Sequence, residues 1–297
     1  MKPDAILPAF ALSGRKLAGW LIVVAGAGYG MLQLVILLQQ QPQVRYAFYA
    51  GMVAAVATAA GALPALFIRR LSQKLHDVML GFGAGVMLAA CMFSLIVPAL
   101  AFLTDSGASP WRSSASVALA ILLGSAFMLL LERVVPHQHF IKAEAHLHSK
   151  ALRRSWLFVF AIALHNIPEG LAIGASFAGG DTAAATALAT GISVQDIPEG
   201  LVVAMALLAV GYSRALAVGI AVLSGLTEPV MAIIGAAVLG ESSLLLPWGL
   251  ALAAGAMLFV ISHEMIPESH RQGHELAATN GLMLGFVLMM LLDTALG

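Results

Sequence analysis

Long apolar runs separated by short polar segments make up most of this chain. An apolar run of about 20 residues can cross the hydrocarbon core of a bilayer as a helix. The runs here are too long for the strands of a membrane barrel, and they lack the strict alternation of such strands. We therefore predict nine membrane-spanning helices, at residues 17–38, 46–68, 78–103, 115–131, 156–178, 182–210, 215–239, 244–266 and 276–296.

The composition agrees with this pattern. Hydrophobic residues make up 60% of the 297 residues and charged residues 10%, whereas about 25% of residues are charged in ordinary soluble domains. The formal net charge is zero, so no global field attracts nucleic acid. Cys91 is the single cysteine and cannot form an intrachain disulfide. The sequence predicts an all-α polytopic membrane protein that contacts lipid, binds no nucleic acid and works inside the bilayer.

The first apolar run has the basic flank of a signal peptide, because Lys2, Arg15 and Lys16 precede it. The run at residues 17–38 is longer than the ~7–15 apolar residues of a signal-peptide core, and no convincing cleavage site follows it. We therefore predict a retained helix. The chain then divides into residues 1–40, a cytoplasmic tail with an extra helix, and residues 41–297, an eight-helix core.

The basic residues indicate an orientation. With a cytoplasmic N-terminus, nine spans place 13 of the 15 Lys and Arg residues on the cytoplasmic side, and Arg45 and Arg112 face outward. Cytoplasmic loops of membrane proteins carry such an excess of basic residues. We expect the N-terminus in the cytoplasm and the C-terminus outside.

The longest polar segment, residues 132–154, is cytoplasmic in this topology. It contains His137, His139, His146 and His148. These side chains could collect metal ions at the membrane surface, or the segment could be a weakly charged tether, since histidines two residues apart do not by themselves define a site. Both interpretations stay open.

Two similar hexapeptides fall near the middle of successive predicted helices. HNIPEG covers residues 165–170, QDIPEG covers residues 195–200, and an acid followed by proline stands near the middle of the next predicted helix. These segments bring four carboxylates close to the bilayer midplane: Glu169, Asp196, Glu199 and Glu228.

No basic side chain is available to pair with these acids. A lone charge at the bilayer centre costs at least ~2.5 kcal/mol. Between Arg154 and Arg271 the sequence has one basic residue, Arg214, which falls in a predicted loop. The acids therefore need protons or a bound mobile cation for neutralisation.

The spacing of the motif residues can bring their polar atoms together on one ion. Residues four apart lie on one helix face, which pairs His165 with Glu169 and Gln195 with Glu199. Asn166 and Asp196 lie about 100° further round their helices. These two could hold a second ion beside the first, with Glu169 and Glu199 bridging the pair.

Prolines and glycines accompany both motifs. Pro168 and Pro198 cannot donate to the carbonyl four residues earlier, so we expect each helix to bend and loosen there. Gly170, Gly174 and Gly200 lack side chains and allow a neighbouring helix to approach closely. We expect the two motif helices to pack together.

The candidate ligands limit the choice of ion. One imidazole, several carboxylates and two amides suit Zn²⁺, Cd²⁺, Fe²⁺ or Mn²⁺, and the absence of thiolates favours reversible binding. Two other functions remain as alternatives, an intramembrane metalloenzyme and a metal sensor. The sequence has no H-E-x-x-H motif and no attached signalling domain.

The paired motifs resemble the signature of the ZIP (Zrt/Irt-like protein) family of divalent-metal transporters, and the resemblance extends from Tyr46 onward. Similarity to this family implies eight core helices with both ends outside, a homodimer, and uptake of zinc and related ions into the cytoplasm. Similarity to its bacterial members implies the inner membrane. The helix at residues 17–38 is an addition to that pattern.

The resemblance also implies a binuclear site and an exit station. The first ion would be held by His165, Glu169, Gln195, Glu199 and a methionine, for which Met87 is favoured over Met92. The second ion would be held by Asn166, Asp196, Glu228 and the two bridging acids, Glu169 and Glu199. His263 and Glu264, in the segment SHEMIPESH, would help to release metal inward, or they could be an ordinary solvated helix end with Glu268 and His270.

The family is thought to work by an elevator-like shift, in which core helices one, four, five and six move past helices two, three, seven and eight. Gly81, Gly85, Gly281 and Gly285 give the proposed scaffold small faces for close packing or sliding. The sequence alone does not separate this shift from rocking.

Gln195 stands where the first motif has a histidine. Because an amide is a poorer ligand for zinc than an imidazole is, we predict a broader choice of metal that includes Cd²⁺.

Overall fold

The computed structural model describes residues 14–68, 70–134, 164–209, 211–242 and 244–296. These residues form helices joined by short turns, with no β-strand among them, which confirms the all-α prediction. The helices are α1 (Gly14–Gln40), α2 (Pro42–Ala62), η1 (Leu63–Leu66), α3 (Gln73–Ala90), η2 (Cys91–Ile96), α4 (Val97–Asp105), α5 (Pro110–Val134), residues 164–178, α7 (Thr182–Ala209), α8 (Arg214–Gly225), α9 (Thr227–Gly240), α10 (Leu246–Val260), η4 (Ile261–Met265), α11 (Ile266–Ser269) and α12 (Glu275–Leu296).

Eight stretches of helix in the described part of the chain are long and apolar enough to cross a membrane. They correspond to eight of the nine predicted spans. The remaining predicted span, at residues 156–178, is described from residue 164 onward and is helical over residues 164–178. The count of nine therefore stays a prediction. The histidine-containing segment, from His137 to His148, lies outside the described residues.

The predicted helix at residues 215–239 is wrong in one respect, because it is divided at Leu226. Helix α8 ends at Gly225 and α9 begins at Thr227. Pro229 has no N–H to donate to the carbonyl of Gly225, so the α-helical hydrogen-bond pattern is interrupted at that residue. The division places Glu228 in the first turn of α9, where the helix dipole favours a negative charge.

The motif prolines do not coincide with irregular helical turns, although we expected the helices to loosen there. Helix α7 continues through Pro198, and residues 164–178 are helical through Pro168. The π-helical turns η2 and η4 instead interrupt the helices that carry α3 to α4 and α10 to α11. Each turn is followed closely by a proline, Pro98 or Pro267, which frees a carbonyl in the preceding turn.

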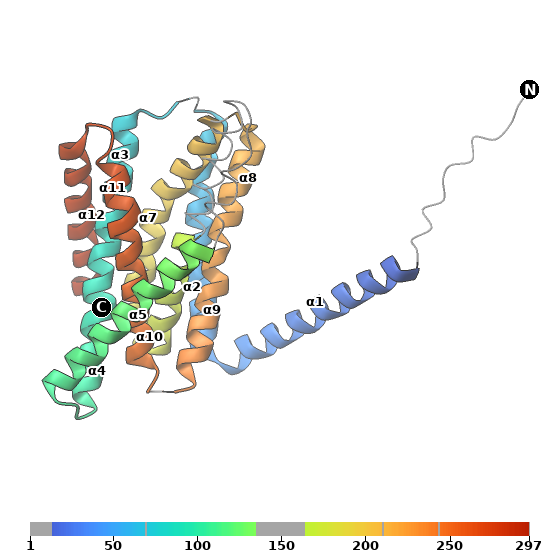
Figure 1. The fold of residues 1–297 in the computed structure, drawn as a ribbon. Helices are drawn as coiled ribbons and strands as arrows, with labels where there is room; N and C mark the ends of the chain where they lie inside the picture. The colour runs from blue at the N-terminus through green and yellow to red at the C-terminus, as the bar shows by residue number, and fades with distance from the viewer. Residues whose placement is uncertain (1–13, 69, 135–163, 210, 243, 297) are drawn as a thin grey trace, which may run out of the picture. The chain divides into compact units, whose positions relative to one another are not determined.

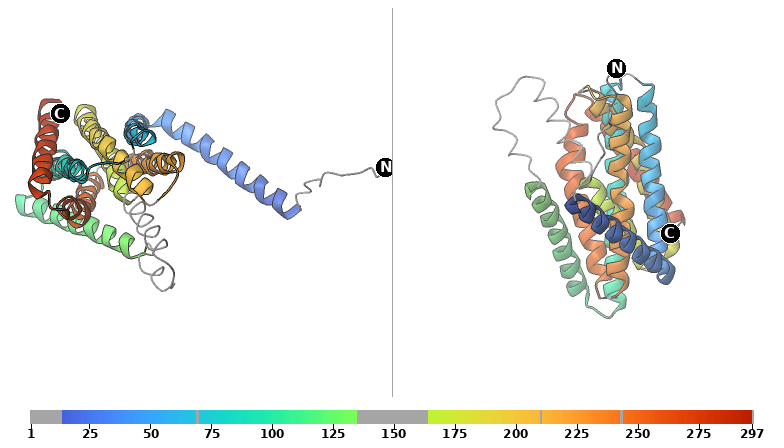
Figure 2. Two further views of the ribbon diagram at one scale, coloured as in Figure 1. Left: turned by 90° about the horizontal axis from the view of Figure 1, so that it is seen from above. Right: turned by 90° about the vertical axis from the view of Figure 1, so that its right-hand side faces the viewer.

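The contacts divide the chain into two units, with the boundary between Pro42 and Gln43. Within the second unit, we distinguish two groups of helices that meet at α7, which contacts α3 and α12 of one group and α8 of the other (Figure 2). The support group consists of α3 with η2 and α4, α5, α10 with η4 and α11, and α12. The site group consists of α2 with η1, residues 164–178, α7, α8 and α9.

Glycines bring α3 and α12, the most extensively packed pair of the support group, into direct backbone contact. A Cβ atom on Gly81 would lie 2.2 Å from the carbonyl oxygen of Ala278, and one on Gly85 would lie 1.9 Å from that of Leu282. Gly281 and Gly285 face the backbone of α3 in the same way. The predicted close packing of these small faces is therefore confirmed.

Glycines also hold the site group together, although with partners other than those expected. Gly170 and Gly174 of the first motif helix face the backbone of α9, and Gly200 of α7 faces the backbone of α2. The two motif helices are therefore not joined through these glycines. They meet instead through the polar side chains of the motifs, which hydrogen-bond across the space between them.

Candidate metal centre

Three helices of the site group carry the polar residues of the motifs into the interior. Residues 164–178 carry His165, Asn166 and Glu169, α7 carries Gln195, Asp196 and Glu199, and α9 carries Glu228. The side chains of Glu169 and Glu228 are completely buried, and those of Asn166, Gln195 and Asp196 are 1% exposed. Three buried acids, Glu169, Asp196 and Glu228, and the partly buried Glu199 therefore come from three helices to the same region.

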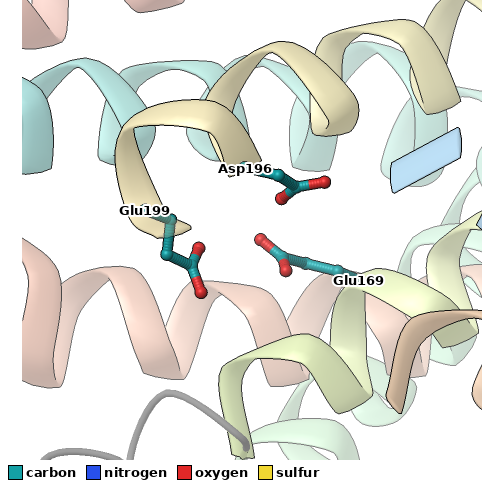
Figure 3. Close-up of side chains that lie close together, drawn as sticks. All are labelled: Glu169, Asp196 and Glu199. Carbon is teal, nitrogen blue, oxygen red and sulfur yellow. The ribbon is translucent and has the colours of Figure 1, made fainter. Parts of the chain in front are cut away.

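The carboxylates of Glu169, Asp196 and Glu199 converge. One oxygen atom from each lies within 4.8 Å of one from each of the other two. Figure 3 shows Asp196 and Glu199 on one helix directed toward Glu169 on the facing helix. Oxygen atoms spaced in this way can bind a single cation of Zn²⁺ size, whose oxygen ligands lie at ~2.0–2.2 Å.

The amide nitrogens of Gln195 and Asn166 both donate hydrogen bonds that hold this arrangement. Gln195 Nε2 donates to Glu169 Oε1 and to Asp196 Oδ1, both at 2.6 Å. Asn166 Nδ2 donates to the carbonyl oxygen of Ser224 at 3.0 Å. Both amide oxygens are thereby left as available ligands.

Six residues of the centre each keep one buried oxygen that has no hydrogen-bond partner among the described residues. A buried oxygen without a partner costs about 1–3 kcal/mol, and more when it is charged. Six such atoms in one place indicate a site built for a group that accepts electron pairs, which a metal ion does. They are Asn166 Oδ1, Glu169 Oε2, Gln195 Oε1, Asp196 Oδ2, Glu199 Oε1 and Glu228 Oε2.

No Lys or Arg in the described ranges forms an ion pair with these acids. Arg214 donates instead to the carbonyl oxygen of Leu66, at the end of η1. Arg271 pairs with Glu268 at 2.7 Å. These two basic residues therefore contact groups outside the metal centre.

The methionine expected at the first ion lies on α3. Met87 is 1% exposed, whereas Met92 is 43% exposed. Gly83, one turn before Met87, faces the centre, since a Cβ atom there would lie 3.1 Å from Gln195 Oε1. These positions favour Met87 over Met92, and its contact with an ion stays a prediction.

The residues expected at the exit make two contacts, the first of which is with His165 of the centre. Glu264 Oε2 lies 3.6 Å from His165 Nε2. His263, in the same π-helical turn, lies 3.3 Å from Glu132 Oε1 and stacks on the ring of Phe259. Imidazole and carboxylate groups thus continue from the buried motifs to the partly exposed end of α5.

Two residues of this neighbourhood escaped the sequence interpretation. Glu132 follows the apolar run of α5 directly, where the sequence predicts the start of a cytoplasmic segment. Thr58, whose Oγ1 lies 3.4 Å from Glu228 Oε1, stands in a run of small residues that gives no signal of a polar role. Both contacts join residues more than 100 positions apart, so helix spacing does not reveal them.

Comparison with known proteins gives an independent view of the chain. A family model described as ZIP zinc transporter matches residues 136–293. The zinc transporter GufA of Myxococcus xanthus is 46% identical over 248 residues, which cover 84% of this chain and 98% of GufA. The zinc transporter ZIPB of Bordetella bronchiseptica is 50% identical over 259 residues, which cover 87% of this chain and 84% of ZIPB. Human zinc transporter ZIP11 is 30% identical over 81% of this chain and 94% of its own length.

Proposed function

Because the chain belongs to the ZIP zinc transporter family, whose members are transporters and not enzymes, we propose that it carries zinc and related divalent ions into the cytoplasm. The observation that carries this proposal is the set of six buried oxygen atoms that have neither a hydrogen-bond partner nor an ion-paired Lys or Arg among the described residues. A mobile divalent cation supplies the missing charge and the missing partners at once.

Two ions fit the arrangement better than one. Glu169 and Glu199 each offer two oxygens between the remaining ligands, so they can bridge the ions. His165, Gln195 and Met87 then complete the first position. Asn166, Asp196 and Glu228 complete the second position. The hydrogen bonds that both amide nitrogens donate support this division, because they leave the amide oxygens for the metal.

Inward release would pass through the contacts that lead away from His165. Glu264 lies beside this imidazole, and His263 lies beside Glu132. Each pair offers one imidazole nitrogen and one carboxylate group, which are fewer ligands than the central site provides. An ion is therefore held strongly at the centre and weakly along the exit, as conduction requires.

The packing of the two helix groups supports an elevator-like shift. Within each group, glycines such as Gly85 and Gly200 meet a neighbouring backbone. Across the boundary, the described glycines face side chains instead, as Gly191 of α7 faces the sulfur of Met289 on α12. Flexible side chains can rearrange as one surface passes another, whereas backbone contacts fix a pair. The site group would thus move as one body.

The remaining proposals concern the setting of the transporter. The membrane-spanning helices and the bacterial relatives support an integral protein of the bacterial inner membrane. The distribution of basic residues supports a cytoplasmic N-terminus and an outer C-terminus. Assembly into a homodimer is proposed by similarity to the family.

Flux measurements separate transport from the alternatives. Purified protein in liposomes, with a zinc-sensitive dye inside, should accumulate Zn²⁺ over time when Zn²⁺ is added outside. Zinc binding without accumulation would support a metal sensor or an intramembrane metalloenzyme instead.

Changing Gln195 to histidine should narrow the choice of metal. An imidazole is a better ligand for zinc than an amide oxygen is. In Gln195→His, competing Cd²⁺, Fe²⁺ and Mn²⁺ should inhibit Zn²⁺ uptake less strongly. The concentration of each ion needed for half inhibition should rise about tenfold, which is the scale of a single changed contact at a metal site. Competition curves in the same liposomes measure this shift. Curves that overlay those of the wild type would contradict a role for Gln195 in selectivity.

A further inference from the structure

Helix α2 contributes no carboxylate to the metal centre, yet one of its side chains reaches an acid of the site. Thr58 is 1% exposed and stands toward the end of α2. Its hydroxyl oxygen lies 3.4 Å from Glu228 Oε1 and 3.3 Å from the carbonyl oxygen of Ala54. The hydroxyl can therefore donate either to its own helix or to the acid.

Two glycines allow this approach. Gly200 follows Glu199 directly, and a Cβ atom on it would lie 2.0 Å from the carbonyl oxygen of Thr58. A Cβ atom on Gly225, the last residue of α8, would lie 3.0–3.3 Å from three side-chain atoms of Thr58. Any larger residue at these positions would push Thr58 away from the helices that carry the acids. The threonine is therefore seated closely between the elements that carry Glu199 and Glu228.

The two oxygens of Glu228 differ in their surroundings. Oε1 lies 3.4 Å from the Thr58 hydroxyl and can accept a hydrogen bond from it, whereas Oε2 is buried and has no hydrogen-bond partner among the described residues. The side chain is completely buried, so water does not set its orientation. With one oxygen anchored, the terminal torsion of the carboxylate is restricted and the other oxygen is held ready for a ligand.

We propose that Thr58 is a positioning residue of the second metal position. Its hydroxyl anchors Glu228 Oε1, and Glu228 Oε2 is thereby directed toward the ion. This inference rests on the proposed function and adds to it a residue from α2. Hydrogen-bonding partners of metal ligands typically change metal affinity by ~10–100-fold when they are removed. Thr58 should contribute an effect of that size at the second position and a smaller one at the first.

Two comparisons separate the effect of the hydroxyl from that of side-chain packing: wild type with Thr58→Val, and Thr58→Ser with Thr58→Ala. Thr58→Val keeps the branched shape and removes the hydroxyl, while Thr58→Ser and Thr58→Ala differ from each other in the hydroxyl alone. Thr190→Val is the matched control, because the Thr190 hydroxyl donates to the carbonyl oxygen of Thr186 on an exposed face of α7.

The test measures bound zinc per purified protein over a range of free Zn²⁺, together with KM, maximal uptake rate and melting temperature without metal. We expect Thr58→Val and Thr58→Ala to bind the second zinc ion ~10–100-fold more weakly and to raise KM. In Thr58→Ser and Thr190→Val, the affinity for the second zinc ion and the KM should stay within about threefold of the wild-type values, which is small beside these effects. Melting temperatures should not follow this order.

Equal affinities in Thr58→Ser and Thr58→Ala would overturn the inference, as would losses that follow the melting temperature. If Thr58→Val fails to fold, the Ser and Ala pair decides the result. If the wild type and all variants bind two zinc ions with the same affinities, the proposed function stays intact and only the role of Thr58 is refuted. Wild-type protein that binds no zinc would overturn both.

Discussion

Glu199→Ala is expected to reduce zinc uptake to the background of empty liposomes. Glu199 is one of three acids whose oxygens lie within 4.8 Å of one another. As the proposed bridge it serves both ions, so its removal takes a ligand from each position at the same time. Loss of a mere supporting partner costs ~10–100-fold at a metal site, and loss of a bridging ligand should cost at least as much.

The initial rate of zinc accumulation in liposomes measures this effect. Glu275→Ala is the matched control, because Glu275 is an exposed acid in the first turn of α12 and lies in the support group. Uptake by the control should remain close to that of the wild type. Undiminished uptake by correctly inserted Glu199→Ala protein would exclude the proposed bridge.

A cross-link between α7 and α12 is expected to stop transport reversibly. Gly191 of α7 faces Met289 of α12, and a Cβ atom on Gly191 would lie 2.1 Å from the Met289 sulfur. Because this contact joins the site group to the support group, fixing it would prevent one group from moving past the other. We expect uptake by Gly191→Cys, Met289→Cys protein to fall at least about tenfold after treatment with a short methanethiosulfonate cross-linker, which joins the two thiols through disulfide bonds, as for a gated conformational step.

Three controls accompany the cross-link. The buried Cys91 is first replaced by alanine, so that no other thiol reacts. Phe93→Cys with Phe286→Cys joins η2 to α12 inside the support group, where the two rings are 6.1 Å apart, and should leave uptake unchanged. A reductant should restore uptake in the first pair. Full uptake with the α7–α12 link in place, verified by mass spectrometry, would contradict a shift along this boundary.

The positions of the membrane-spanning helices could be predicted from sequence because the bilayer imposes one simple requirement, a long apolar run. The divisions within them could not be placed by that rule. Pro229 and Gly225 are local signals for the break at Leu226, but the apolar run continues across it and hides the break. The π-helical turns η2 and η4 depend on how α3 and α10 pack, which no local pattern records.

The motif residues of the centre could be predicted for a different reason. Their spacing within each helix fixes a shared face, and the cost of a buried acid requires a common partner. Gln195 thus meets Glu169 across 26 positions, as the paired motifs suggest. Thr58 and Glu132 could not be found in this way, because only the folded bundle brings them to Glu228 and His263.

Anomalous X-ray scattering from crystals grown with Zn²⁺ tests most directly whether a mobile cation neutralises the buried acids. The account predicts two peaks, both in contact with Glu169 and Glu199, with ligand oxygens at ~2.0–2.2 Å from the metal. One peak should also contact His165 and Gln195, and the other should contact Asp196 and Glu228. Zinc bound only near His263, with no metal in contact with the four acids, would contradict the account.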